Sequence, residues 1–83
     1  MREHAARFVA HRVQAWTHCG HTPSELAIAR ATQRTVELLR AAYRARHVAT
    51  RTPPDPLGAS AALTAAHEAV EQAFADDERR SAQ

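Results

Sequence analysis

Large apolar side chains are scarce in this sequence, and their scarcity limits the core that it can build. Leu, Ile, Val and Phe together account for 13 of the 83 residues, or 16%, whereas alanine alone accounts for 20. Chains this poor in large apolar residues are often disordered, but disorder usually comes with a high net charge, and the formal charge here is only +2. We therefore expect an all-α fold in which alanine-lined helices approach one another closely around a thin core.

The length of the chain predicts a small unit of marginal stability. A domain of this size buries only about 60% of the surface that its unfolded form exposes, and a thin core adds little to that. We therefore predict one helical domain over residues 1–83 that assembles as a homo-oligomer or binds another protein subunit.

The first half of the sequence predicts two helices joined by a short corner. Apolar residues recur at helical spacing over residues 2–19, and Gly20 suits the left-handed conformation that follows a helix end. Thr22 supplies an N-cap hydroxyl for a second helix over residues 23–49, and Glu25 completes a capping box. A connection this short predicts a helical hairpin.

The second half predicts a linker, a third helix and a tail. Four prolines fall between residues 23 and 57, and three of them lie close together in residues 50–59, where they end the second helix and indicate a stiff linker. Ser60 supplies the N-cap for a third helix over residues 61–77, whose apolar residues share one arc. Residues 78–83 indicate a polar tail that frays. The three helices are expected to form an oligomeric bundle.

Several function classes lack the residues that they require. No apolar run approaches the roughly 20 residues that span a bilayer, and no apolar segment near the first Met resembles a signal peptide. The sequence has no lysine, which rules out a phosphate-loop lysine and Schiff-base chemistry. No paired carboxylates share a helical face with an acid–base partner. We expect a cytoplasmic protein that is not an enzyme and has no cofactor and no contact with a membrane.

Aromatic residues and apolar residues outside the main arcs are the candidates for contact with a partner. Phe8 projects about 80° from the apolar arc of the first helix, and Leu26 and Val48 lie off the arc of the second. Another chain could bury such side chains, although a broader core within the chain accounts for them equally well. The preferred function is a helical protein–protein interaction module, a small accessory or regulatory subunit. Its predicted interface residues are Phe8, Val13, Trp16, Leu26, Leu39, Tyr43 and Val48.

The alternative function is nucleic-acid binding through an arginine strip on the second helix. Such a strip can follow a phosphate backbone, but Glu37 within it favours pairing on an exposed helix face. Residues 1–51 carry nine Arg and three Glu, whereas residues 52–83 carry two Arg and six acids, so the third helix could also cover the strip. The arginine strip consists of Arg30, Gln33, Arg34, Arg40 and Arg44.

A further alternative is a metal-responsive corner formed by His18, Cys19 and His21. Imidazole and thiolate suit zinc or copper, but a closed zinc site needs four ligands, so His47 or His67 would have to join. Histidines that cap helices or face solvent account for the same pattern. Cys19 is the only cysteine and lies at the carboxyl end of the first helix, where the dipole opposes a thiolate, so we do not expect a catalytic nucleophile.

Overall fold

The computed structural model of the chain consists of three helices, α1 (Arg2–His18), α2 (Glu25–Val48) and α3 (Pro56–Ser81). It describes residues 2–48 and 56–82, and these two ranges contain no strand. The all-α prediction is therefore confirmed for this part of the chain. The first two helices lie within two residues of their expected bounds.

α1 ends in a Schellman motif, as its glycine predicts. The backbone amide of His21 donates to the carbonyl of Trp16 at 3.0 Å, and that of Gly20 donates to Thr17 at 3.1 Å. These are the two hydrogen bonds that define the motif. Gly20 has a φ of 104°, which a residue with a Cβ atom adopts only at a cost. The motif reverses the chain direction and holds the backbone of His21 against the last turn of α1.

The N-cap of α2 is Ser24 rather than Thr22, so this part of the capping-box prediction was wrong. The backbone amide of Ala27 donates to the Ser24 hydroxyl at 3.2 Å, and that of Ile28 donates to the Ser24 carbonyl at 2.9 Å. Pro23 thus precedes the cap instead of opening the helix, and it is buried. The sequence offered two hydroxyls, and the structure uses the one on the helical side of the proline.

α3 is longer than expected at both ends. It begins at Pro56, inside the segment predicted to be linker, and continues to Ser81, inside the predicted polar tail. Ser60 therefore lies within the helix and is not its cap. A proline at the first helical position is favourable because its missing N–H has no intrahelical partner there. Residues 49–55, which hold the rest of the predicted linker, lie outside the described residues.

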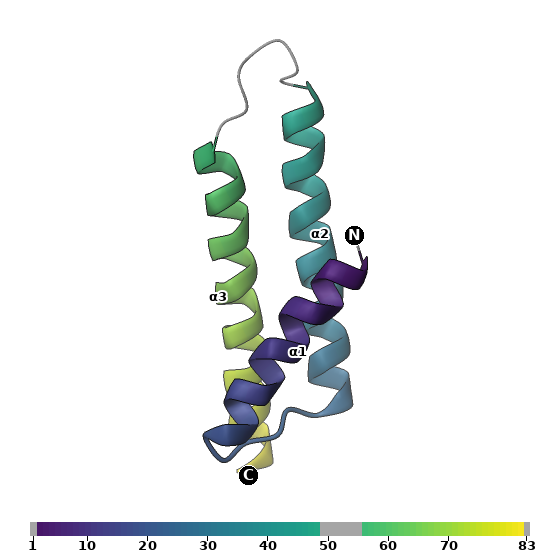
Figure 1. Cartoon of the computed structure of the whole chain (residues 1–83). Coiled ribbons are helices and arrows are strands. Elements are labelled where there is room, and N and C mark those ends of the chain that lie inside the picture. Colours follow the sequence, from purple (N-terminus) through teal and green to yellow (C-terminus); the bar gives the residue numbers. More distant parts are fainter. Residues whose placement is uncertain (1, 49–55, 83) are drawn as a thin grey trace.

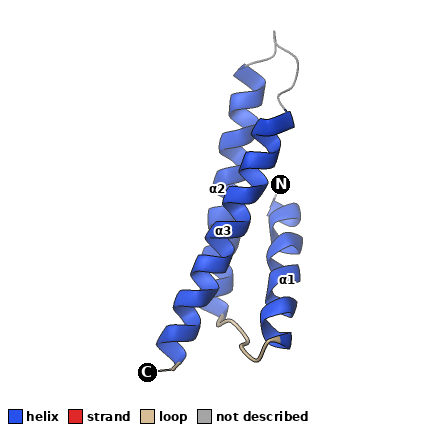
Figure 2. Cartoon of the chain, turned by 90° about the vertical axis from the view of Figure 1, so that its left-hand side faces the viewer, coloured by secondary structure: helices blue, strands red, loops and turns tan. Residues whose placement is uncertain are grey.

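In space, α2 and α3 form a long antiparallel pair, and α1 packs obliquely on one face of this pair (Figure 1). Figure 2 shows α1 standing to one side of both other helices. The most extensive packing is between α2 and α3, and the molecule measures 51 × 19 × 18 Å. With 17 residues against 24 in α2, α1 is about 10 Å shorter at 1.5 Å per residue. It therefore leaves the far end of the pair uncovered.

The core lies where all three helices meet. Phe74 and Val70 of α3 pack with Val9 of α1 and with two alanines of α2, and all five side chains are buried. Small residues on α2 allow the close approach that the composition predicts. Burial extends as far as Val36 and Ala66. Ala6 and Leu63 are exposed, although they lie on the apolar arcs of α1 and α3. The two alanines of α2 are Ala27 and Ala31.

Candidate functional site

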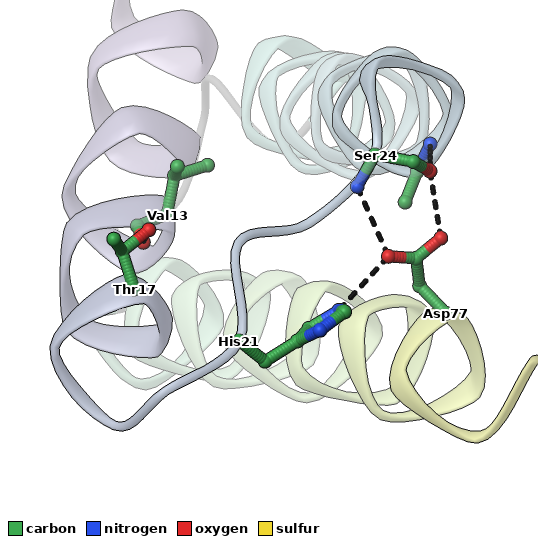
Figure 3. A network of polar contacts seen from close by, with 6 residues as sticks. Val13, Thr17, His21, Ser24 and Asp77 are labelled. Atoms are coloured by element: carbon green, nitrogen blue, oxygen red, sulfur yellow. Dashed lines mark hydrogen bonds and ion pairs between the residues drawn. The ribbon is translucent and has the colours of Figure 1, made fainter. Parts of the chain in front are cut away.

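Asp77, near the end of α3, joins the corner to the start of α2 (Figure 3). Its Oδ1 atom accepts a hydrogen bond from the Ser24 hydroxyl at 2.6 Å, and its Oδ2 atom accepts one from the Ser24 backbone amide at 3.0 Å. The Nε2 atom of His21 lies 2.9 Å from the same Oδ2 atom. Ser24, His21 and Asp77 form the Asp77 cluster, which ties segments more than 50 residues apart.

The electrostatics of the Asp77 cluster follow from its place at a helix N-terminus. A carboxylate there is stabilised by unpaired amides and by the positive end of the helix dipole. Hydrogen bonds from the hydroxyl and the amide of Ser24, followed by the contact with His21, hold the pKa of Asp77 below its usual value, although burial opposes this. The arrangement favours an ionised Asp77 that caps α2 from another helix.

Serine, histidine and aspartate occur together here without the order that catalysis requires. In a catalytic triad the imidazole lies between the carboxylate and the hydroxyl, so that it can remove the hydroxyl proton. Here Asp77 is the central group, and the Ser24 hydroxyl donates directly to it while accepting from the amide of Ala27. The Ser24 hydroxyl is thus occupied as a cap. The cluster fixes structure, and its geometry gives no support to a nucleophile.

A second polar cluster joins α1 to the middle of α3. Arg12 Nε donates to Glu71 Oε1, and the Trp16 indole nitrogen donates to Glu71 Oε2 at 2.8 Å. His67 lies one turn away on α3, with Nε2 at 3.7 Å from Oε1. We call these four residues the Glu71 cluster. Burial raises the pKa of Glu71, but the hydrogen bonds from Arg12 and Trp16 and the charge of Arg12 outweigh it, so the pKa is lowered.

The two carboxylates predict a loss of stability in acid. Folding lowers the pKa of Asp77 and of Glu71. Both ionised carboxylates therefore stabilise the fold when the pH is above their unfolded-state pKa values of about 4. This stabilisation is lost as the pH falls through their lower folded-state pKa values. We therefore expect the unfolding temperature to be unaffected by these groups above about pH 5 and to fall below about pH 4. Circular dichroism at a series of pH values measures this dependence.

Substitution of the two carboxylates tests whether they cause the expected loss of stability in acid. Asp77→Asn combined with Glu71→Gln is expected to reduce the dependence of the unfolding temperature on pH between about 5 and 2. Glu68→Gln, on the exposed side of α3, is the matched control and keeps the wild-type slope. A double variant with the full wild-type slope would contradict the assignment.

Three of the predicted interface residues pack against the core of their own chain. Phe8, Val13 and Trp16 are half-buried against it. The Trp16 ring meets the Phe74 ring edge-on with centroids 6.2 Å apart, and Phe8 meets His67 in the same way at 6.4 Å. Trp16 therefore contacts α3 through its ring and through its indole nitrogen.

The other predicted interface residues lie at opposite ends of the molecule. Leu26 is 56% exposed and lines a shallow hollow between the start of α2 and the end of α3. Leu39 is half-buried and Tyr43 is 59% exposed, and both lie toward the far end of α2. The side chain of Val48 lies outside the described residues. The structure thus does not bring the seven residues together into one surface.

α1 does not reach the far end of the α2–α3 pair (Figure 1). We call residues 38–44 and 61–66 the open tip. Leu63 is 54% exposed, although it is seven residues before the buried Val70 and hence on the same side of α3. Leu39 follows the buried Val36 by three residues on α2. The core-facing side of both helices therefore continues into the open tip without a third helix to cover it.

The arginine strip is exposed along α2, and all five of its predicted members face solvent. Among the described residues, its one ion pair is between Arg34 and Glu37 at 3.3 Å, within the same helix, as the spacing predicts. Arg30 borders the hollow that Asp76 and Asp77 also line. Glu71 pairs with Arg12 and Asp76 pairs with Arg79. Because all five residues of the strip are exposed, α3 does not cover it.

The histidine–cysteine corner does not converge. His18 and Cys19 are exposed, whereas His21 is directed to Asp77. Among the side chains that the structure describes, which do not include that of His47, no three His, Cys, Asp or Glu residues are placed to hold a metal ion.

Four residues that organise the two clusters were missed by sequence reasoning. Arg12 and Glu71 lie on helix faces that a hydropathy pattern classes as polar, and Ser24 and Asp77 are ordinary surface residues by type. A partial signal was present at Ser24, because a serine directly after a proline and before a helical run is a suitable cap. Nothing in the sequence pairs it with a residue 53 positions later.

Comparison with protein-family models, with curated proteins and with solved structures finds no match for this chain. No helix in the described ranges is long and apolar enough to cross a membrane.

Proposed function

We propose that this chain is a non-enzymatic helical interaction module, a small accessory or regulatory subunit that binds a helix of another protein through its open tip. One observation carries the proposal: Leu63 lies on the core-facing side of α3 and is 54% exposed. A single exposed leucine is ordinary on a protein surface, whereas apolar residues that gather at one place point to a contact with a partner. Tyr43, which is 59% exposed, and the half-buried Leu39 lie at the same end of the α2–α3 pair as Leu63.

The packing of the rest of the molecule supports a partner of this kind. α1 covers the α2–α3 pair only as far as Val36 and Ala66, which are both buried. Beyond that level Tyr43 and Leu63 are exposed and Leu39 is half-buried, and Leu39 and Leu63 continue the core-facing sides of their helices. A helix placed in line with α1 covers this surface and extends the three-helix packing.

We expect Leu63→Asp to abolish the association, because it places a charge in the apolar surface. The tagged chain is isolated from its native cells at low salt, and size exclusion with light scattering gives the mass of the assembly. Wild type and Leu26→Asp are expected in a complex of fixed stoichiometry, and Leu63→Asp as the free 9.1 kDa chain. Leu26 is the matched control because it is equally exposed at the opposite end.

Equal behaviour of the two aspartate variants would contradict the proposal, as would a wild-type chain that is monomeric under all conditions. Circular dichroism checks that both variants keep the helical content of the wild type. Loss of the complex in a variant that retains its helices assigns the contact to the open tip.

A second candidate function, nucleic-acid binding, is favoured by the exposure of the arginine strip. The strip spans four turns of α2, and α3 does not cover it. We expect affinity for a duplex to fall with salt, and Arg34→Ala or Arg40→Ala to reduce the salt slope by about one each. Fluorescence anisotropy at several salt concentrations measures this. Arg79→Ala is the control, because Arg79 pairs with Asp76 inside α3; equal slopes for all three variants would exclude the strip.

A further inference from the structure

We propose that the partner helix is amphipathic and acidic, with its apolar side on Leu39 and Leu63 and its carboxylates toward Arg40 and Arg44. This inference rests on the proposed function and adds the chemistry of the partner. It comes from the shape and the charge of the open tip taken together.

The shape of the open tip fits one short helix. α2 extends from Leu38 to Val48 beyond the level that α1 covers, which is about 16 Å at 1.5 Å per residue. A partner helix of about three turns fills this length in line with α1. In such a helix-in-groove contact the anchors recur at i, i+3 or i+4, and i+7. Leu39 on α2 and Leu63 on α3 then lie on the two sides of the seam.

The open tip is positively charged, and none of its described side chains is acidic. Residues 38–44 and 61–66 contain Arg40 and Arg44 and no acid. The whole sequence from residue 38 to residue 66 has four arginines and one acid, whereas the rest of the chain has seven arginines and eight acids. The described side chains of the open tip thus carry two positive charges and no negative charge.

This charge disfavours a second copy of the chain as the occupant. In a two-fold dimer the same patch faces itself, so the open tips would bring Arg40 and Arg44 of one copy close to those of the other. Like charges across an interface are costly. An acidic helix instead pairs with these arginines while it covers the leucines. Arg40 lies about 60° around α2 from Tyr43 and so borders the apolar surface.

The test uses two synthetic helical peptides that differ only in charge. Both carry leucine at positions i, i+4 and i+7 over three turns; one has glutamate at its flanking positions, and the other has lysine. Fluorescence anisotropy with the labelled peptides gives their affinities for the full chain. We expect the glutamate peptide to bind at least tenfold more tightly than the lysine peptide at low salt, with the difference shrinking at high salt.

Variants of the chain locate the contact. Leu63→Asp and Arg40→Glu are each expected to weaken the glutamate peptide about tenfold or more, since each removes an anchor or reverses a charge. Leu26→Asp and Arg30→Glu at the other end are the matched controls and leave its affinity unchanged. Leu39→Gln is a milder second variant that serves if Leu63→Asp lowers the helical content.

The remaining outcomes separate this inference from the proposed function. Equal binding of the two peptides, or equal effects of the variants at both ends, overturns the inference. A dimer that Leu63→Asp dissociates, in a chain that binds neither peptide, overturns the inference and leaves an interaction module. A chain that binds a DNA duplex through Arg40, and neither a peptide nor itself, overturns both.

Discussion

Phe74→Ala is expected to remove most of the stability of this fold. Phe74 is fully buried and packs on the Trp16 ring and on Val9, Val70 and two alanines. Truncating a buried phenylalanine costs about 3–5 kcal/mol, with the higher values where the neighbours cannot fill the cavity. Its alanine neighbours have no side chain that could move into the space. A chain of this length is expected to have roughly 4–12 kcal/mol in total, so the loss is a large fraction of it.

Urea denaturation followed by circular dichroism measures the loss. Trp16 is the only tryptophan and contacts Phe74, so its fluorescence gives a second, local reading of the same transition. Leu63→Ala is the control: it also truncates a large apolar residue of α3, but an exposed one, and is expected to cost about 0.5 kcal/mol or less. Comparable losses in the two variants would show that the core is not centred on Phe74.

Asp77→Ala is the other substitution with a large expected effect. It leaves the hydroxyl and the amide of Ser24 and the ring of His21 without their shared acceptor. Hydrogen bonds to a charged group are worth about 1.5–3 kcal/mol in total effect, so we expect a loss of about 2 kcal/mol and a fall of about 10 °C in the unfolding temperature. Amide hydrogen exchange is expected to quicken in the first turn of α2, because its cap is weakened.

The neighbouring residue is the matched control for this prediction. Asp76 is also an aspartate on α3, but its hydrogen bonds are to Gln72 and Arg79 within that helix. Asp76→Ala is expected to change the unfolding temperature by a few degrees at most. A similar shift in both variants, or unchanged exchange in the first turn of α2, would count against the role assigned to Asp77.

The helices themselves could be predicted from local sequence. The end of α1 follows from Gly20, whose positive φ suits the Schellman motif, and the long run of α2 follows from the absence of Gly and Pro. The exposed side of α1 also follows from helical spacing, because His4, His11 and His18 recur every seven residues and all face solvent. These features depend on residues within one or two turns of each other.

The long-range contacts could not be predicted in this way. Arg12 and Glu71 are residues of types that usually face solvent, and their contact depends on how α1 lies across α3. Leu63 fits the apolar arc of α3, yet it is exposed because α1 ends before it. The spacing of apolar residues predicts which side of a helix is apolar. It does not predict whether another helix is long enough to cover that side.

Both polar clusters depend on residues near the end of the chain, and this has a consequence for the order in which the fold can form during synthesis. The N-cap partner of α2 is residue 77, and the partner of Arg12 and Trp16 is residue 71. A nascent chain that has reached only residue 70 therefore holds α1 and α2 without either cluster and without Phe74. The three-helix packing must therefore wait until the last turns of α3 have emerged from the ribosome, and α1 and α2 cannot complete the fold as they are synthesised.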